Sequence, residues 1–123
     1  MSGYHELEIF KSAFDLAIRV HKLSLDLPKH EMYEQGGQIR RASKSIKDQI
    51  AEGYGRRDYK AEFIKFIVYS QASCDECINQ IEMIIRLYPE KEEWQELLAD
   101  YIRLGKKINL FLRYVRTSWR SIK

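Results

Sequence analysis

Apolar residues recur at helical spacing along nearly the whole chain, and no sustained stretch alternates with a period of two residues. This pattern predicts an all-α protein with four long helices, over residues 7–27, 35–54, 59–87 and 91–118. Pro28 ends the first helix and Pro89 the third, because proline lacks the amide hydrogen and disfavours helix in the residue before it. The connections are short, so we expect an antiparallel up-down-up-down four-helix bundle that forms a single domain over residues 1–123.

Each predicted helix carries an apolar stripe for a shared core. The stripe of the first comprises Phe10, Ala13, Phe14, Ala17, Val20 or His21, Ser24 and Leu27. The stripe of the second comprises Ile39, Ser43, Ile46, Ile50 and Gly53, with steps of four and three as in a coiled coil. The third and fourth stripes include Phe63, Ile67, Cys74, Ile81 and Ile85, and Trp94, Leu97, Tyr101, Ile108 and Val115.

The turn between the second and third helices is marked by Gly53-Tyr54-Gly55. Glycine adopts the left-handed conformation that closes many helices, so we expect it to do so here. Asp58 is the expected N-cap of the third helix, and Glu62 follows in its first turn, where the helix dipole favours an anion.

The apolar sets of the third and fourth helices are wider than the three positions in about seven that one core-facing stripe needs. They include Ile64, Ile67, Val68, Ile84, Ile85 and Leu87 in the third helix, and Leu110, Phe111, Leu112, Tyr114 and Val115 in the fourth. This width predicts a second buried face and hence self-association. Deep burial at the centre of the bundle is the alternative.

A chain of 123 residues with 45% apolar and 32% charged residues can build one core under a charged surface, and it is too short for most large enzyme folds. The longest apolar runs are far too short to span a membrane, and the N-terminus does not have the pattern of a signal peptide. Two cysteines do not make a disulfide scaffold. We therefore expect a soluble cytoplasmic domain.

The net charge of +3 is small, but the charges are segregated. Residues 72–100 are strongly acidic, whereas residues 101–123 contain basic residues and no acidic ones. Residues 36–60 are also basic, and they provide the candidate nucleic-acid contacts Arg40, Arg41, Lys44, Lys47, Arg56, Arg57 and Lys60, close to Tyr33, Tyr54 and Tyr59. Ordinary solvated faces and contacts between subunits are the alternatives.

The chain offers little for catalysis, and we predict no catalytic residue, cofactor or metal. Cys74-x-x-Cys77 lacks further zinc ligands nearby and is better interpreted as packed small residues. The acidic cluster Glu92, Glu93, Glu96 and Asp100 could bind magnesium only with a second acidic pair, for which Asp48 and Glu52 or Asp75 and Glu76 are the candidates. A magnesium-dependent, all-helical nucleotide pyrophosphohydrolase is therefore a distant alternative.

One motif is more specific. The stretch Gln38-Ile39-Arg40-Arg41-Ala42-Ser43-Lys44-Ser45-Ile46, with Ile50-Ala51-Glu52-Gly53-Tyr54-Gly55-Arg56 after it, resembles bacterial four-helix-bundle proteins encoded in intervening sequences of ribosomal RNA genes. That family, formerly labelled a ribosomal protein family, is related to the accessory variability protein of diversity-generating retroelements.

The resemblance implies a non-enzymatic homopentamer with basic surfaces for RNA or DNA. It also implies a reverse transcriptase as a possible partner. By resemblance, Arg40, Arg41 and Arg56 would contact a polyanion or pair between subunits, and Glu52-Gly53 would form a structural turn. The leading hypothesis is an oligomer that binds structured nucleic acid through phosphates, and the alternative is a protein-interaction scaffold without nucleic-acid affinity.

Overall fold

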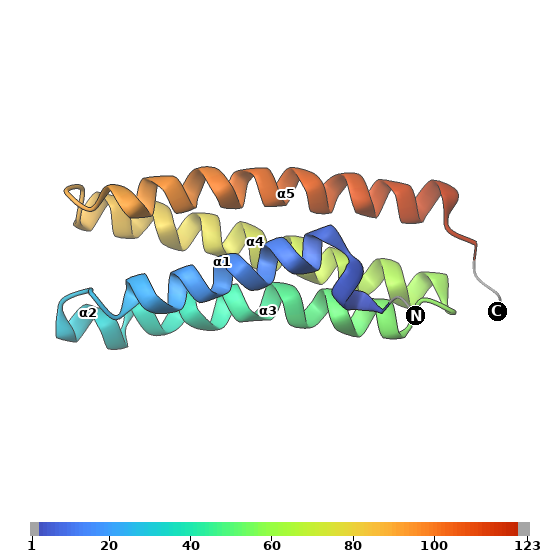
Figure 1. Cartoon of the computed structure of the whole chain (residues 1–123), viewed down its shortest axis with the longest axis horizontal. Helices are drawn as coiled ribbons and strands as arrows, with labels where there is room; N and C mark the ends of the chain where they lie inside the picture. The colour runs from blue at the N-terminus through green and yellow to red at the C-terminus, as the bar shows by residue number, and fades with distance from the viewer. Residues whose placement is uncertain (1–2, 121–123) are drawn as a thin grey trace.

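The computed structural model describes residues 3–120, which form helices and no strand (Figure 1). A 3-10 helix, η1 (Tyr4–Glu6), is followed by α1 (Glu8–Ser24), α2 (Lys29–Tyr33), α3 (Gln35–Gly55), α4 (Lys60–Leu87) and α5 (Glu92–Ser118). The long helices α1, α3, α4 and α5 run alternately in opposite directions along one axis. This confirms the predicted all-α, antiparallel four-helix bundle.

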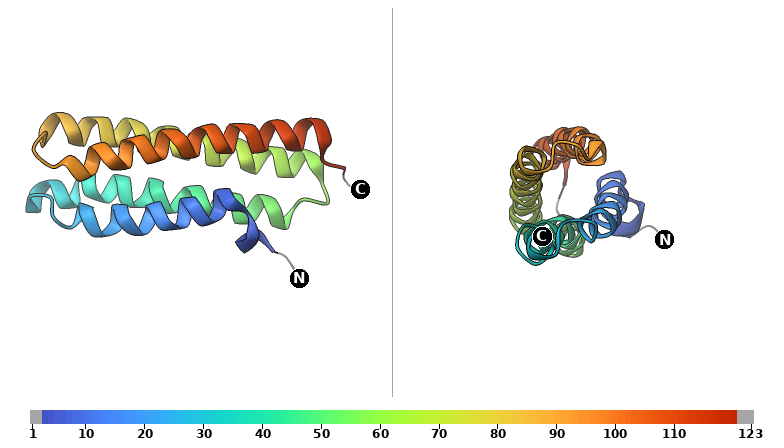
Figure 2. Two further views of the ribbon diagram at one scale, coloured as in Figure 1. Left: turned by 45° about the horizontal axis from the view of Figure 1, so that its top comes forward. Right: turned by 90° about the vertical axis from the view of Figure 1, so that its left-hand side faces the viewer.

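The long helices occupy the corners of a square (Figure 2). In this arrangement α1 packs against α3, α3 against α4, α4 against α5, and α5 against α1. Neighbours in sequence are therefore neighbours in space, as short connections require. The acidic first turn of α5 holds Glu92 and Glu93, and its last turn holds Arg116, as the helix dipole favours.

The segment around Pro28 differs from the prediction. Helix α1 ends at Ser24, three residues before the predicted end, and Pro28 becomes the N-cap residue of the short helix α2. Glu34, with φ −84° and ψ −91°, then turns the chain into α3. Proline fits this position because the first amides of a helix have no partner within the helix. The hydrophobic pattern did not predict α2.

The turn between α3 and α4 corrects two further predictions. No glycine among the described residues has a positive φ, and α3 continues to Gly55 with Arg56 as its C-cap, so the left-handed glycine cap is wrong. The N-cap position of α4 is Tyr59, not Asp58. Gly53 is needed for a different reason, because a Cβ there would lie 2.9 Å from the Cβ of Phe66 in α4.

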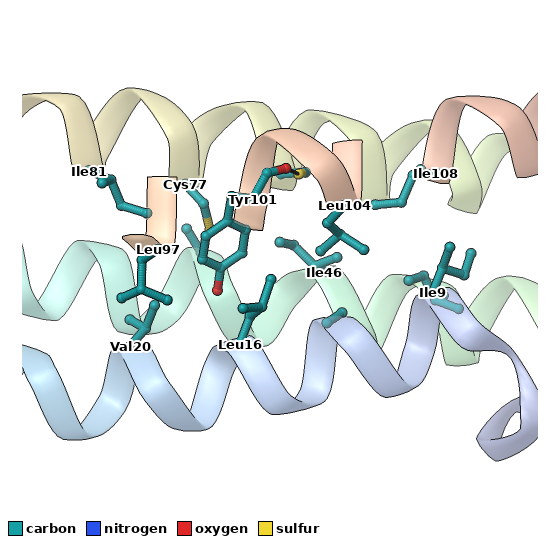
Figure 3. Close-up of a cluster of buried hydrophobic side chains, with 14 of the residues drawn as sticks. Ile9, Leu16, Val20, Ile46, Cys77, Ile81, Leu97, Tyr101, Leu104 and Ile108 are labelled. Atoms are coloured by element: carbon teal, nitrogen blue, oxygen red, sulfur yellow. Dashed lines mark hydrogen bonds between the residues drawn. The ribbon is translucent and has the colours of Figure 1, made fainter. Parts of the chain in front are cut away.

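The core runs the length of the bundle between the four long helices. Figure 3 shows Leu97 and Tyr101 of α5 extending toward Leu16 and Val20 of α1. The predicted stripe of the second helix is fully buried, and the central apolar residues of the third and fourth stripes are buried with it, Ile85 being half-buried. The phenol of Tyr101 lies in the middle of the core, where burial raises its pKa.

The stripe of the first helix needs correction. Ala13, Ala17, Val20 and Ser24 are buried, but His21 is exposed and the ring of Phe14 is 41% exposed. Positions 13 and 14 are 100° apart on a helix, so the small alanine faces the core and the larger ring lies at the edge of the buried stripe.

Part of the wide apolar faces also lies outside the core. Val68 and Leu87 of α4 and Leu110 and Tyr114 of α5 are exposed, whereas Ile67, Ile84, Leu112 and Val115 are buried. Burial at the centre of the bundle therefore accounts for only some of these residues.

The seam between α1 and α5 is closed partly by charges. Arg19 pairs with Asp100 at 2.6 Å, and Lys107 pairs with Glu8 at 3.0 Å. Two clefts of about 290 and 300 Å³ open along this seam, and charged side chains make up most of their lining. Helix α1 is therefore held to α5 less by apolar packing than α3 is held to α4, where Gly53 lets the two backbones approach closely.

Candidate nucleic-acid interface

The seven basic residues predicted as nucleic-acid contacts have different environments in the structure. Four lie on α3, two lie in the turn after it, and Lys60 begins α4. Some form hydrogen bonds or ion pairs within the chain. Others have charged groups without such a partner in residues 3–120, and we call these uncommitted. This difference decides which of them remain available for a ligand.

Arg40 joins three helices. Its Nη1 donates to Ser24 Oγ at the end of α1 at 2.8 Å, and its Nη2 donates to the backbone oxygen of Met32 in α2 at 3.0 Å. Gly36, one turn earlier in α3, leaves room for this side chain, because a Cβ there would lie 3.0 Å from Arg40 Nη1. The half-buried guanidinium of Arg40 therefore serves the fold.

Arg56 lies between two carboxylates at the turn. It pairs with Glu52 of α3 and with Glu62 of α4, each at 3.1 Å, and its guanidinium lies 4.9 Å from the centre of the Phe66 ring. The hydrogen bond that Arg56 donates to the Glu52 carboxylate raises the pKa of Arg56, so the group stays charged. These contacts connect the end of α3 to the start of α4.

Arg57 is held in a cluster of aromatic rings. Its guanidinium lies 4.1 Å from the centre of the Tyr54 ring, and Nη1 donates a 2.8 Å hydrogen bond to the backbone oxygen of Tyr54. The backbone oxygen of Arg57 accepts a 3.0 Å hydrogen bond from the indole of Trp119, whose ring packs edge-on against Phe63. These contacts hold the turn between α3 and α4 against Trp119, the residue that follows α5.

Arg41, Lys44 and Lys60 form no hydrogen bond or ion pair within residues 3–120. Arg41 and Lys44 are exposed on α3, and Lys60 is half-buried. Lys47 lies one turn after Lys44, where its Nζ pairs with Asp48 Oδ1 at 2.6 Å and lies 5.5 Å from the centre of the Phe14 ring. The predicted contacts with uncommitted charge on α3 are therefore Arg41 and Lys44.

Lys44 and Lys47 border a groove between α3 and α1. We call it the basic groove and define it by its lining residues Phe14, Ala17, Ile18, His21, Lys22, Lys44 and Lys47. Its volume is about 380 Å³, its floor is apolar, and its lining includes three lysines and no carboxylate. The charge pattern indicated Lys44 and Lys47, but it did not indicate Lys22, because the first predicted helix has mixed charges.

A second basic surface lies on α5, at the corner diagonal to α3 (Figure 2). Arg103 pairs with Asp100, and Lys107 pairs with Glu8. Lys106 and Arg116 form no ion pair within the described part of the chain.

The acidic cluster at the start of α5 is not completed by a second acidic pair. Asp100 is paired with Arg19 and Arg103, which hold the pKa of its carboxyl below the usual value. Asp48 is paired with Lys47, and Glu52 with Arg56. Residues 3–120 contain no group of three or more His, Cys, Asp or Glu side chains placed to hold a metal ion.

Cys74 and Cys77 are free thiols in the core, where they pack as predicted. Burial raises the pKa of the Cys74 thiol to about 12, and it also raises the pKa of Cys77. Both thiols are therefore neutral near pH 7, and neither is activated as a thiolate nucleophile.

The described helices include none that is both long and apolar enough to cross a lipid bilayer.

Comparison with known proteins identifies the family to which the chain is similar. The family model described as "23S rRNA-intervening sequence protein" matches residues 5–110. No curated protein matches the chain significantly.

A crystal structure of a protein of unknown function from the S23 ribosomal protein family of Bacteroides thetaiotaomicron is similar, with a TM-score of 0.77. The similarity covers 85% of this chain and 95% of that one, at 20% sequence identity. At that identity, the likeness supports the fold and carries no information about the ligand.

Proposed function

The chain belongs to the 23S rRNA-intervening sequence protein family, and we propose that it is a non-enzymatic, homo-oligomeric helical bundle that binds structured nucleic acid by contacts to phosphates. The observation that carries this proposal is the basic groove, together with Arg41, which lies on α3 about one turn before Lys44. Its lysines come from two helices, its lining has no carboxylate, and the charges of Arg41 and Lys44 are uncommitted.

Lysine and arginine side chains that have no partner within the protein can bind the phosphates of a nucleic acid with a gain in free energy. Each lysine or arginine that neutralises a phosphate releases condensed counterions, which supplies affinity with little dependence on base sequence. A cation already paired within the protein contributes less, because the pair must first be broken. We therefore place the main contacts at Arg41, Lys44 and Lys22, and a weaker one at Lys47, whose pair with Asp48 must first be broken. Arg40, Arg56 and Arg57 then have structural roles.

The double variant Arg41→Gln/Lys44→Gln tests this surface. Fluorescence anisotropy with an RNA stem-loop and a DNA duplex, titrated at several salt concentrations, should show weaker binding of both ligands. The slope of log affinity against log salt should fall by about two, one for each lost phosphate contact. The control is Arg86→Gln/Lys91→Gln, which removes the same charge from the acidic part of the chain. Equal losses in the two double variants would contradict the proposed surface.

Exposed apolar side chains support the homo-oligomer. On α4, Tyr69 and Met83 are 45% and 51% exposed, and on α5, Leu110 and Tyr114 are 60% and 49% exposed. Native mass spectrometry should give a complex with five times the 14.7 kDa mass of the chain, the pentamer that the resemblance implies. A monomer across the micromolar range would contradict self-association.

The same exposed residues favour a second candidate, a protein-interaction scaffold that uses apolar faces and has no affinity for nucleic acid. A reverse transcriptase is one such partner implied by the resemblance. The two functions separate at low salt, because the scaffold shows no anisotropy change with either RNA or DNA under those conditions.

A further inference from the structure

The ring of Phe14 is the least expected feature of the basic groove. It lies on α1, 41% exposed, with the similarly exposed Ile18 one turn later and the buried Ala17 between them at the floor. The Phe10 ring lies next to it, tilted by 47° and 5.9 Å away between centroids. Lys47 Nζ lies over the Phe14 ring, 5.5 Å from its centre, at the α3 side of the groove. An aromatic surface is thus open to solvent inside a border of lysines.

Contacts to phosphates alone do not need this ring. In a duplex the base faces are stacked on each other, so a protein that holds only the backbone needs cations and hydrogen-bond donors. An unpaired nucleotide presents a π-face and a phosphate within one residue, and proteins bind such nucleotides with aromatic side chains beside a positively charged groove. The basic groove provides both elements.

The size of the groove argues against a partner helix. A helix that docks in a groove needs anchors at positions i, i+3 or i+4, and i+7, which span at least two turns. The exposed apolar part of the basic groove is limited to Phe14 and Ile18, one turn apart. Its volume of about 380 Å³ lies at the small end of the range for small-molecule sites. The border of three lysines without a carboxylate complements an anion.

We propose that the basic groove binds an unpaired nucleotide of a nucleic-acid strand, with the base against Phe14 and Ile18 and the phosphate near Lys44 and Lys22. This inference rests on the proposed nucleic-acid function and narrows its ligand to strands with unpaired bases, such as loops, bulges and single-stranded ends. The groove then discriminates a single strand from a blunt duplex of the same sequence.

The test uses the full chain and single-stranded 12-nucleotide RNA and DNA of one sequence, each with a single 2-aminopurine, together with the blunt duplex. Stacking on the protein should change the 2-aminopurine fluorescence, and the two strands show whether ribose or deoxyribose is preferred. We expect Phe14→Ala to weaken single-strand binding about tenfold or more, with an unchanged salt slope and unchanged duplex affinity. Phe14→Tyr keeps an aromatic face and should retain binding. Ile102→Ala, which removes an apolar side chain of the same 41% exposure from α5, is the matched control.

Each other outcome overturns the inference in a distinguishable way. If Phe14→Ala leaves single-strand affinity unchanged while Lys44→Gln weakens it, the nucleotide site is wrong and the phosphate-binding function stands. If the unmodified protein binds no nucleic acid at low salt, the proposed function fails together with the site. If Phe14→Ala lowers the mass of the oligomer, the groove is a contact between subunits. Should Phe14→Ala fail to fold by circular dichroism, Phe14→Leu takes its place, and equal binding by the Leu and Tyr variants would contradict stacking.

Discussion

Replacing Arg40 with alanine should lower the free energy of unfolding by about 2–3 kcal/mol, although the residue is charged and only half-buried. Its guanidinium makes two charge-assisted hydrogen bonds, to Ser24 Oγ and to the Met32 oxygen, and no neighbour replaces them once the side chain is removed. The variant should therefore loosen α2 and the end of α1 against α3. Urea denaturation followed by circular dichroism measures the effect.

The adjacent Arg41 provides the control. It is exposed and forms no hydrogen bond or ion pair within residues 3–120, so Arg41→Ala should change stability by no more than about 0.5 kcal/mol. The order should reverse for nucleic-acid binding, where Arg41→Ala weakens affinity and Arg40→Ala, under conditions where it is folded, has the smaller effect. Equal stabilities of the two variants would show that the contacts of Arg40 do not hold the fold.

Gly53→Ala should also destabilise the protein, by about 1–2 kcal/mol. The added Cβ would lie 2.9 Å from the Cβ of Phe66 and 3.5 Å from Phe63, so α3 and α4 would have to separate. Overpacking of this kind costs about 1–3 kcal/mol, and the higher helix propensity of alanine offsets up to about 1 kcal/mol of that cost.

Gly55→Ala is the matched control, two residues further along the same helix. A Cβ at Gly55 would meet nothing within 4 Å, and the residue lies in α3 with a negative φ. The substitution should leave the thermal midpoint unchanged or raise it, because alanine restricts the unfolded chain. Thermal unfolding of both variants side by side measures the difference, and similar midpoints would contradict the close approach of α3 and α4 at Gly53.

The contrast between the two glycines shows which parts of the fold the sequence could predict. Helical periodicity located the four long helices because it reports which positions are buried on average along a segment. It carries no information on how close two helices come. The sequence alone therefore suggests a left-handed turn as the reason for glycine at position 53. The actual reason is the close approach of Phe66 on α4, which only the packed structure shows.

The candidate site was predictable in a similar, partial way. The distribution of charge along the chain indicated Arg41, Lys44 and Lys47, because charge is a property of each residue alone. The pairing of a charge depends on residues elsewhere in the chain. Arg40 bonds to Ser24 across a separation of 16 residues, and no local sequence pattern predicts this contact. Phe14 was assigned to the core because it is one residue from the true stripe, and only the packing of Ala13 and Ala17 shows that its ring is at the surface.

The charged seam between α1 and α5 has a consequence for how the bundle opens. Salt weakens ion pairs such as those of Arg19 and Lys107 more than it weakens apolar contacts, so we expect the packing of α1 against α5 to loosen as the salt concentration rises. The basic groove spans α1 and α3, with Lys22 on one side and Lys44 on the other. A ligand bound in the groove would dissociate whenever α1 separates from α3. Binding and the partial unfolding of α1 are therefore thermodynamically linked, and an occupied groove protects the amide hydrogens of α1 from exchange with solvent.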